Sequence, residues 1–164
     1  MITIKMITDE LEKYDKTICT VFPGIQTWEI KNLEQKLKWR LPNNLKIFLE
    51  KCNGFKLVSE VVYGIHSDKK FDIYENYIWE KEESNNPIWD YLLPISPDGS
   101  GSHYCIDLKS IDADYNECKV VYWQHDYNYD EQDPPDVESD TILDFFWELL
   151  ETVKLSNNYD GTDK

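Results

Sequence analysis

Two polar clusters contain the residue types that most often carry acid–base or metal chemistry. His103 and Asp107 lie in one predicted strand, and His125 and Asp126 follow another. A histidine beside a carboxylate can move protons or bind zinc. His103 and Asp107 are four positions apart, however, so about 13 Å separates their backbones in an extended strand. A hydrolase or metal-dependent enzyme that uses these residues therefore stays an alternative, which requires the fold to bring them together.

Two other motifs have the composition of ligand-binding loops but lack essential members. The run Asp98-Gly99-Ser100-Gly101 could cradle a phosphate, yet no Lys-Ser/Thr pair and no helix follow it. A hairpin turn is the better interpretation. Asp112, Asp114 and Glu117 loosely match a calcium loop without its required glycine and terminal glutamate. We therefore expect the protein to need neither a metal nor a cofactor.

The segment from His125 to Asp133 alternates carboxylates with tyrosines. Tyrosine buries a large amphipathic area on binding, and carboxylates pair with arginine or lysine of a partner protein. The alternative is a solvated loop whose tyrosines fold back on the domain. The candidate partner-binding residues in this loop are Asp126, Tyr127, Tyr129, Asp130, Glu131 and Asp133.

Apolar periodicity predicts the helices that surround these segments. Residues 30–54 encode two short amphipathic helices that are joined at Leu41-Pro42. Thr27 can cap the first helix, Pro42 suits the first position of the second, and Gly54 can close it in the left-handed conformation. The apolar face of the second helix consists of Leu45, Phe48, Leu49 and Cys52.

The clearest periodicity lies near the end of the chain. It predicts a helix from about Thr141 to Val153, capped by Ser139 or Asp140. Phe145 and Phe146 belong to its apolar face, which we expect to pack on the sheet. A first short helix is predicted around Ile7, Leu11 and Tyr14.

Short β-branched and aromatic runs predict the strands at 55–58, 61–64, 91–96, 104–108 and 120–124. Residues 21–24 read as a turn, 66–90 as a long loop with one helical turn, and 125–140 as an acidic loop. This order indicates a single α+β domain. We expect a mainly antiparallel sheet of about five or six strands, with the N-terminal helices and one C-terminal helix packed on one side. The domain should span residues 1–155, followed by a polar tail at 156–164.

The charge of the chain is strongly asymmetric. The net charge is −15, but residues 1–60 have ten bases and eight acids, whereas residues 61–164 have seven bases and 24 acids. Such a field repels phosphate backbones, so we expect no direct binding of nucleic acid, and it attracts a basic protein or a cation. An acidic surface that only keeps a bacterial cytosolic protein soluble is the alternative.

The four cysteines show no CxxC spacing, so we expect free, buried thiols at Cys19, Cys52, Cys105 and Cys118. No segment resembles a signal peptide, and no window approaches the roughly 18 apolar residues of a membrane helix. These features favour a location in the reducing cytoplasm and no contact with a membrane.

Five short motifs occur in order between residues 25 and 150. They are Leu41-Pro42, Asn53-Gly54, the turn and strand with Gly99, Gly101, Tyr104 and Asp107, the strand end with Val120, Trp123, His125 and Asp126, and the Phe-rich helix Ile142 to Leu150. Together these motifs resemble the SUKH superfamily, which contains the Smi/Knr-type regulator domain of fungi and bacterial immunity proteins of the YobK type. One departure is Gly101-Ser102-His103, where Gly-Asp or Gly-Asn is frequent in the family.

The resemblance implies a binding domain without catalysis. Bacterial members are mostly taken to neutralise secreted or contact-delivered toxins, often nucleases or deaminases, by binding them. Combined with the acidic charge, this predicts an immunity protein whose partner is a nuclease-like toxin with a basic surface. A regulatory scaffold without a toxin partner is the remaining alternative.

Overall fold

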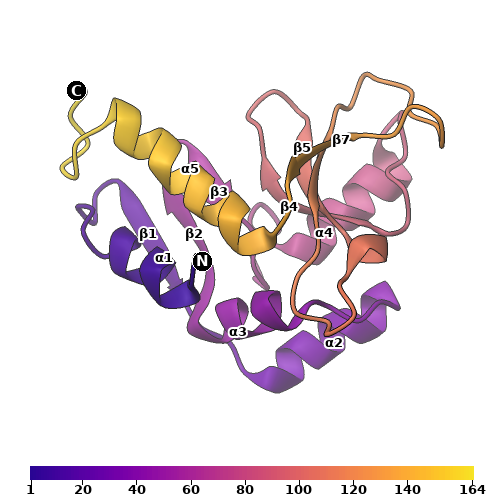
Figure 1. Ribbon diagram of the computed structural model, residues 1–164, viewed down its shortest axis with the longest axis horizontal. Helices are drawn as coiled ribbons and strands as arrows, with labels where there is room; N and C mark the ends of the chain where they lie inside the picture. The colour runs from indigo at the N-terminus through magenta and orange to yellow at the C-terminus, as the bar shows by residue number, and fades with distance from the viewer.

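The computed structural model describes residues 1–164, which form two antiparallel sheets and five α-helices (Figure 1). The first sheet has the order β1–β2–β3, with Cys19–Pro23, Cys52–Leu57 and Glu60–Val62. The second has the order β4–β5–β6–β7, with Leu92–Pro97, His103–Asp107, Val120–Trp123 and Asp136–Ser139. The α-helices are α1 (Ile4–Leu11), α2 (Thr27–Leu37), α3 (Asn43–Lys51), α4 (Ile73–Ile78) and α5 (Ile142–Ser156). Two short elements complete the fold, a π-helix η1 (Trp79–Glu83) and a 3-10 turn η2 (Leu108–Ser110).

The two sheets are joined where the chain leaves β3. The Tyr63 N–H donates to the Ile95 carbonyl at 2.9 Å, and the Ser96 hydroxyl donates to the Val61 carbonyl at 2.7 Å. One cluster of 37 buried apolar residues runs through both sheets. The expected single α+β domain is therefore confirmed, with seven strands divided between two sheets.

Helix α5 packs against both sheets through its phenylalanines, as its periodicity predicts. Phe146 is fully buried, and its ring lies 4.7 Å from that of Phe48 and 6.5 Å from that of Phe55. Phe145 lies 5.1 Å from the ring of Tyr104 on β5. The aromatic face of α5 therefore covers one side of β5 and holds the two sheets together.

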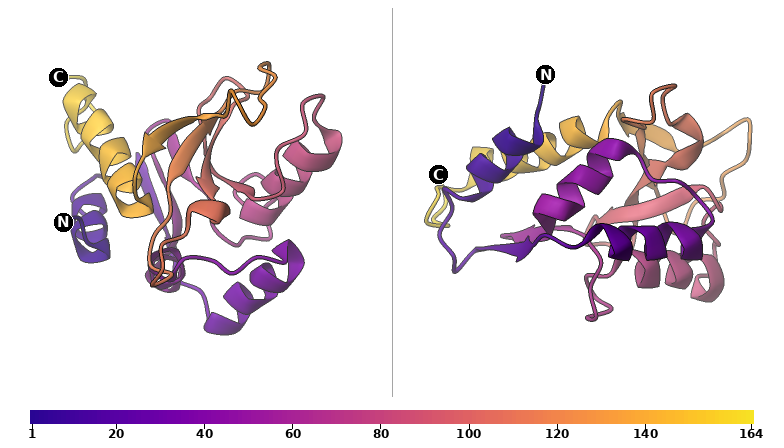
Figure 2. Two further views of the ribbon diagram at one scale, coloured as in Figure 1. Left: turned by 45° about the vertical axis from the view of Figure 1, so that its right-hand side comes forward. Right: turned by 90° about the horizontal axis from the view of Figure 1, so that it is seen from below.

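A second helical segment covers the opposite side of the four-stranded sheet. Because side chains alternate along a strand, His103 points away from Tyr104, and it meets Glu80 of η1. The segment α4–η1 lies on this side, away from α5 (Figure 2). The prediction of helices on one side only misses this segment, since residues 66–90 were expected to be a long loop. Its capping residue, Asp72, accepts hydrogen bonds from the N–H groups of Glu75 and His66.

Two strands were not predicted, β1 because its strand-favouring residues run into Pro23-Gly24, and β7 because most of its residues are polar or acidic. Strand β1 is short and includes Pro23, and the turn prediction for residues 21–24 is wrong over its first three positions. Strand β7 lies at a sheet edge, and Asp136, Val137 and Glu138 are exposed. Charged side chains protect edge strands from pairing with other chains, which explains the composition of β7.

Three helix starts differ from the predicted caps. Thr27 is the first helical residue of α2, and Gln26 occupies the cap position. Pro42 occupies the cap position of α3, with an extended ψ of 143°. The helix therefore begins at Asn43, one residue later than predicted. Helix α5 is capped by the hydroxyl of Thr141, which accepts from the Asp144 N–H, and not by either of the two residues before it.

Asn53-Gly54 continues the chain from α3 directly into β2 and does not close the helix. Gly54 has a φ of +83°, and a Cβ there would lie 2.3 Å from the Val62 carbonyl oxygen. The Asn53 side chain accepts from the Ile65 N–H at 2.7 Å and donates to the Ile65 carbonyl at 2.8 Å. The left-handed conformation of Gly54 was predicted correctly. Its role is different from the predicted one, because the absence of a side chain lets the backbone of β3 and of the segment after it approach Gly54 closely.

Gly54→Ala is expected to lower the free energy of unfolding by about 2–3 kcal/mol, because left-handed strain adds to a backbone collision. Gly99→Ala is the matched control, since Gly99 has a φ of +85° but a Cβ there would have no other atom within 4 Å. It should cost only the strain, about 1 kcal/mol. Urea unfolding of both variants measures the difference, and equal losses would contradict the collision.

The polar residues after α5 fold back on the first helix. The Tyr159 hydroxyl donates to Glu10 at 2.7 Å, the Tyr159 carbonyl accepts from the Asp15 N–H at 2.8 Å, and the two rings of Tyr159 and Tyr14 lie 4.9 Å apart. Burial raises the pKa of Glu10, but hydrogen bonds from Lys13 and Tyr159 outweigh it and lower the pKa below its ordinary value. Residues 156–164 thus contact the domain.

All four cysteines are buried free thiols, as expected.

Candidate functional site

The acidic segment 125–135 connects β6 to β7 at the end of the molecule opposite the chain termini (Figure 1). Tyr129 in this loop folds back on the domain. Its hydroxyl accepts from the Gln124 N–H at 3.1 Å, and its ring lies 4.8 Å from the ring of buried Trp123. Tyr127 remains 42% exposed and stacks on Tyr129 with the ring centroids 4.7 Å apart. Of the two candidate tyrosines, Tyr127 presents the larger surface to a partner.

The carboxylates of the loop are exposed, and two of them shape its backbone. The Asp130 carboxylate accepts from the N–H groups of Gln132 and Asp133 at 2.8 and 2.9 Å. Asp133 also accepts from the Tyr127 hydroxyl, and this hydrogen bond raises the pKa of Tyr127. Asp126 and Glu131 make no such contact and belong to none of the ion pairs of the protein. The loop therefore presents negative charge that no basic side chain of the protein neutralises.

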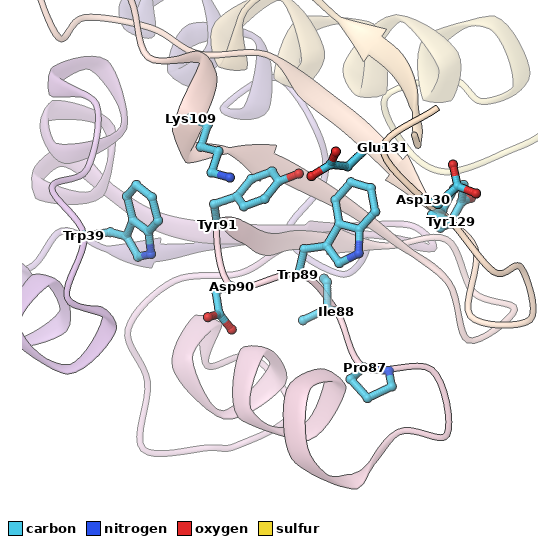
Figure 3. Close-up of a pocket in the computed structure, with 10 residues that line it drawn as sticks. All are labelled: Trp39, Pro87, Ile88, Trp89, Asp90, Tyr91, Lys109, Tyr129, Asp130 and Glu131. Carbon is cyan, nitrogen blue, oxygen red and sulfur yellow. The ribbon is translucent and has the colours of Figure 1, made fainter. Parts of the chain in front are cut away.

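An open groove of about 770 Å³ lies beside this loop (Figure 3). It combines Trp39 from the connection between α2 and α3, Trp89 and Tyr91 from the segment before β4, and Lys109 from η2 with the loop itself. We call this feature the aromatic groove; its lining is Trp39, Pro87, Ile88, Trp89, Asp90, Tyr91, Lys109, Tyr129, Asp130 and Glu131. Sequence reasoning missed it because these segments are far apart in the chain.

The side chains that line the aromatic groove are held by contacts with one another and with neighbouring residues. Trp89 packs with its ring centroid 5.7 Å from that of Tyr91 and 5.8 Å from that of Trp123. The Lys109 ammonium lies 4.0 Å from the centroid of the Tyr91 ring, a cation–π contact. Asp90 is paired with Lys81 at 2.9 Å. The groove is thus a preformed surface with half-buried aromatic rings.

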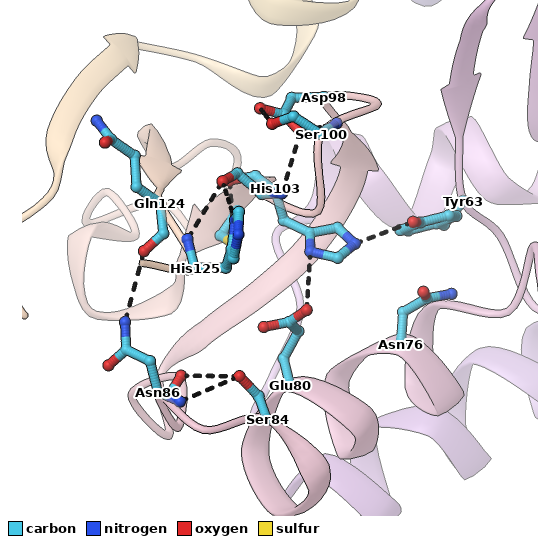
Figure 4. A network of polar contacts seen from close by, with 12 residues as sticks. Tyr63, Asn76, Glu80, Ser84, Asn86, Asp98, Ser100, His103, Gln124 and His125 are labelled. Carbon is cyan, nitrogen blue, oxygen red and sulfur yellow. Dashed lines mark hydrogen bonds and ion pairs between the residues drawn. The ribbon is translucent and has the colours of Figure 1, made fainter. Parts of the chain in front are cut away.

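The four residues of the enzyme alternative are not brought together. His103 is buried, with Nε2 3.1 Å from the Tyr63 hydroxyl and Nδ1 3.3 Å from the Glu80 carboxylate (Figure 4). Asp107, at the other end of β5, accepts from the Lys109 N–H at 3.0 Å. A catalytic pair would need its groups within hydrogen-bonding reach, and these two are occupied by different neighbours.

His125 and Asp126 lie just after the end of β6, at the start of the acidic loop. The His125 Nδ1 is 2.9 Å from the Ser102 hydroxyl, which also accepts from the His125 N–H at 3.2 Å. Asp126 is exposed. No group of three or more histidine, cysteine, aspartate or glutamate side chains is arranged to hold a metal ion. None of the helices is both long and apolar enough to cross a membrane.

The motif residues of the β4–β5 hairpin support this end of the sheet. Asp98 accepts from the N–H groups of Ser100 and Ser102 at 2.8 and 3.0 Å, and from the Tyr122 hydroxyl at 2.6 Å. Burial raises the pKa of Asp98, but the hydrogen bonds from Tyr122, Ser100 and Ser102 outweigh it and lower the pKa below its ordinary value. Gly99 and Gly101 have positive φ angles in this turn.

Asp98→Asn is expected to flatten the acid dependence of stability. Because the folded-state pKa of Asp98 is lower than that of the unfolded chain, its ionised form stabilises the fold above about pH 4, and this contribution is lost as the pH falls further. Urea unfolding at pH 3 and pH 6 should show a smaller difference for the variant than for the native protein. Asp126→Asn, whose side chain is exposed, is the control, and an equal change in both variants would contradict the assignment.

The remaining motif residues are structural. Leu41, Trp123 and Asn53 are buried, and Tyr104 packs on α5.

The chain matches the family model described as SMI1-KNR4 cell-wall over residues 4–150, which includes every motif named above. The match extends over nearly the whole described domain, from α1 to within α5. This protein belongs to the SMI1-KNR4 family, within the SUKH group that its motifs resemble.

Proposed function

We propose that this protein is a non-catalytic binding domain that acts as an immunity protein, neutralising a nuclease-like toxin through its acidic surface. The observation that carries the proposal is the β6–β7 loop, whose exposed carboxylates lie beside the aromatic groove. Membership of the SMI1-KNR4 family supports a binding role. His103 and Asp107 lie at opposite ends of β5 and have different hydrogen-bond partners, which favours this reading over the enzyme alternative.

The mechanism is occlusion of the toxin's substrate groove. A nuclease binds phosphates through a basic groove, and the acidic loop would cover that groove as a phosphate backbone does. The net charge of −15 attracts such a surface from a distance and raises the rate of encounter more than the final affinity. The aromatic side chains then supply the apolar contact area that keeps the complex together. The site of action would be the cytoplasm, where an incoming toxin finds nucleic acid.

The test begins with the adjacent open reading frame, which we expect to encode a secreted, toxin-like protein. Its toxic domain and this protein, mixed in equal amounts, should elute together from a sizing column as a stoichiometric complex. Separate elution at micromolar concentration, or a neighbouring gene that encodes a metabolic enzyme, would contradict the proposal. If this protein alone converted the substrate of that metabolic enzyme into product, the enzyme alternative would be favoured instead.

A further inference from the structure

We propose that the aromatic groove is a receptor for an arginine side chain on a protruding loop of the partner protein. The inference rests on the proposed function, because it names the group by which a basic partner is recognised. It adds the chemistry of the contact, which the acidic loop alone does not specify. The occupant is a peptide segment with one arginine at its tip.

The groove combines aromatic rings with an exposed carboxylate. Figure 3 shows the Glu131 carboxylate beside the Tyr91 hydroxyl and close to the Trp89 ring, with Trp39 across the groove. Glu131 takes part in none of the protein's ion pairs. A guanidinium is planar, stacks on aromatic faces and pairs with a carboxylate through two parallel N–H donors. The groove offers both of these contacts within one surface.

One aromatic ring of the groove, and another beside it, already accept cations of the protein itself. The Lys109 ammonium lies 4.0 Å from the centroid of Tyr91, and the Arg40 guanidinium lies 4.0 Å from the centroid of Tyr115 in an adjoining pocket that shares Trp39 with the groove. Lys109 covers Tyr91, so Trp39 and Trp89 remain as the rings available to a partner. Tryptophan has the strongest affinity for cations among aromatic side chains.

The charge of the lining favours a cation. Three carboxylates and one ammonium line the groove, those of Asp90, Asp130, Glu131 and Lys109. Asp90 is paired with Lys81, and the cations Lys38 and Arg40 belong to the adjoining pocket. The lining of the groove is therefore net negative. An anionic or neutral side chain would enter against this field or gain nothing from it, whereas a cationic side chain is attracted.

The size of the groove suits a peptide segment. Its volume is about 770 Å³, and it is open to solvent. Pockets of roughly 300–1,000 Å³ take ligands much larger than one amino acid side chain. The space suits a short loop with its backbone, and an arginine at the tip can reach Glu131 while flanking residues contact Trp39.

The experiment follows the indole N–H signals of the protein in ¹⁵N-labelled form during titration with three blocked peptides of the sequence Gly-Xaa-Gly. Xaa is arginine, lysine or citrulline, and citrulline keeps the shape of arginine without its charge. The chain has six tryptophans, and Trp39→Phe and Trp89→Phe assign the two relevant signals. We expect both signals to shift with the arginine peptide, to shift less with lysine, and not to shift with citrulline.

Variants of exposed residues keep the result interpretable. Glu131→Gln should weaken binding of the arginine peptide at least fivefold, while Glu12→Gln, an exposed acid directly after α1 that does not line the groove, should leave it unchanged. Equal shifts with citrulline, or shifts confined to other tryptophans such as the exposed Trp28, would overturn the inference.

The same variants separate this inference from the proposed function. If Glu131→Gln and Trp39→Ala proteins, confirmed as folded by circular dichroism, bind the neighbouring toxin with native dissociation rates, the groove is not the receptor although the immunity role stands. If the arginine peptide binds and the toxin does not, the groove inference is supported and the immunity role fails. Faster dissociation of the toxin, at least tenfold, from both variants supports the two together.

Discussion

His103→Ala is expected to lower the free energy of unfolding by about 2–4 kcal/mol, because it removes a buried ring and leaves the buried Glu80 carboxyl without its partner. Glu80 is 3% exposed, and its Oε2 has no hydrogen-bond partner. His103, at 3.3 Å from Oε1, is the only ion-pair partner of this carboxylate. Removing the imidazole would also leave the Tyr63 hydroxyl without its contact to Nε2. The π-helix η1 would then lose its polar attachment to β5.

The control is His125→Ala, because His125 is exposed and its ring contacts the Ser102 hydroxyl at the surface. It should cost less than about 1 kcal/mol. Adding Glu80→Gln to the His103→Ala protein should recover part of the loss, since an amide carries no charge to bury. Urea unfolding at pH 7 measures all three. Equal losses for the two histidine variants would contradict the buried pair.

Replacing Asp126, Asp130, Glu131 and Asp133 by lysine is expected to slow association with a basic toxin by at least about tenfold at low salt. The physical reason is the loss of long-range attraction before contact. Above about 0.15 M salt the difference should shrink, because the Debye length falls to about 8 Å. Surface-based binding kinetics at two ionic strengths provide the measurement.

A reversal limited to two of these four acids changes the charge of the loop without changing its shape. Asp130 and Asp133 also hold the loop backbone and Tyr127, so reversing them changes the shape of the loop as well as its charge. Asp126 and Glu131 have no such role, and their double reversal should slow association by a smaller factor without moving the loop. Reversal of Glu12 and Asp163, exposed acids directly after α1 and next to the C-terminus, makes the same change in net charge outside the acidic loop. Equal slowing by both pairs would place the interface elsewhere.

Tyr127 should act on a different step of binding. It is 42% exposed and its ring rests on Tyr129, so Tyr127→Ala removes contact area with little effect on the fold. Among mutants of one interface, such changes mainly affect dissociation. Faster dissociation with unchanged association is the expected result. An unchanged dissociation rate would leave the tyrosine outside the interface.

The elements that could be predicted from the sequence are those with strong local patterns. The spacing of Phe145, Phe146 and Leu149 identifies α5, and the burial of Phe146 confirms its inward face. Segment α4–η1 could not be predicted in the same way, because α4 has only six residues and the segment is held by tertiary contacts, such as that of Glu80 in η1 with His103 in β5. Strand β7 was missed because its edge position tolerates acidic side chains.

The candidate site shows the same division between local and long-range information. Composition indicated the acidic loop, and the loop is exposed as expected. The alternative of tyrosines that fold back on the domain holds for Tyr129, whose ring contacts Trp123 and whose hydroxyl accepts from the Gln124 N–H. It does not hold for Tyr127, which is 42% exposed. The alternation of tyrosines with carboxylates could not decide between the two orientations, because each depends on tertiary contacts. The aromatic groove combines Trp39, Trp89 and Glu131, and only the tertiary fold brings them to one surface.

The most direct test of the central claim is inhibition of the neighbouring gene's toxin by this protein. Purified toxic domain would be titrated with the native protein, and with the variant in which Asp126 and Glu131 are reversed, while cleavage of nucleic acid is followed. We expect the native protein to abolish cleavage at a one-to-one ratio, and the variant to require a large excess at low salt. Complete inhibition by both proteins at equal amounts, or no inhibition by either, would contradict neutralisation through this acidic surface.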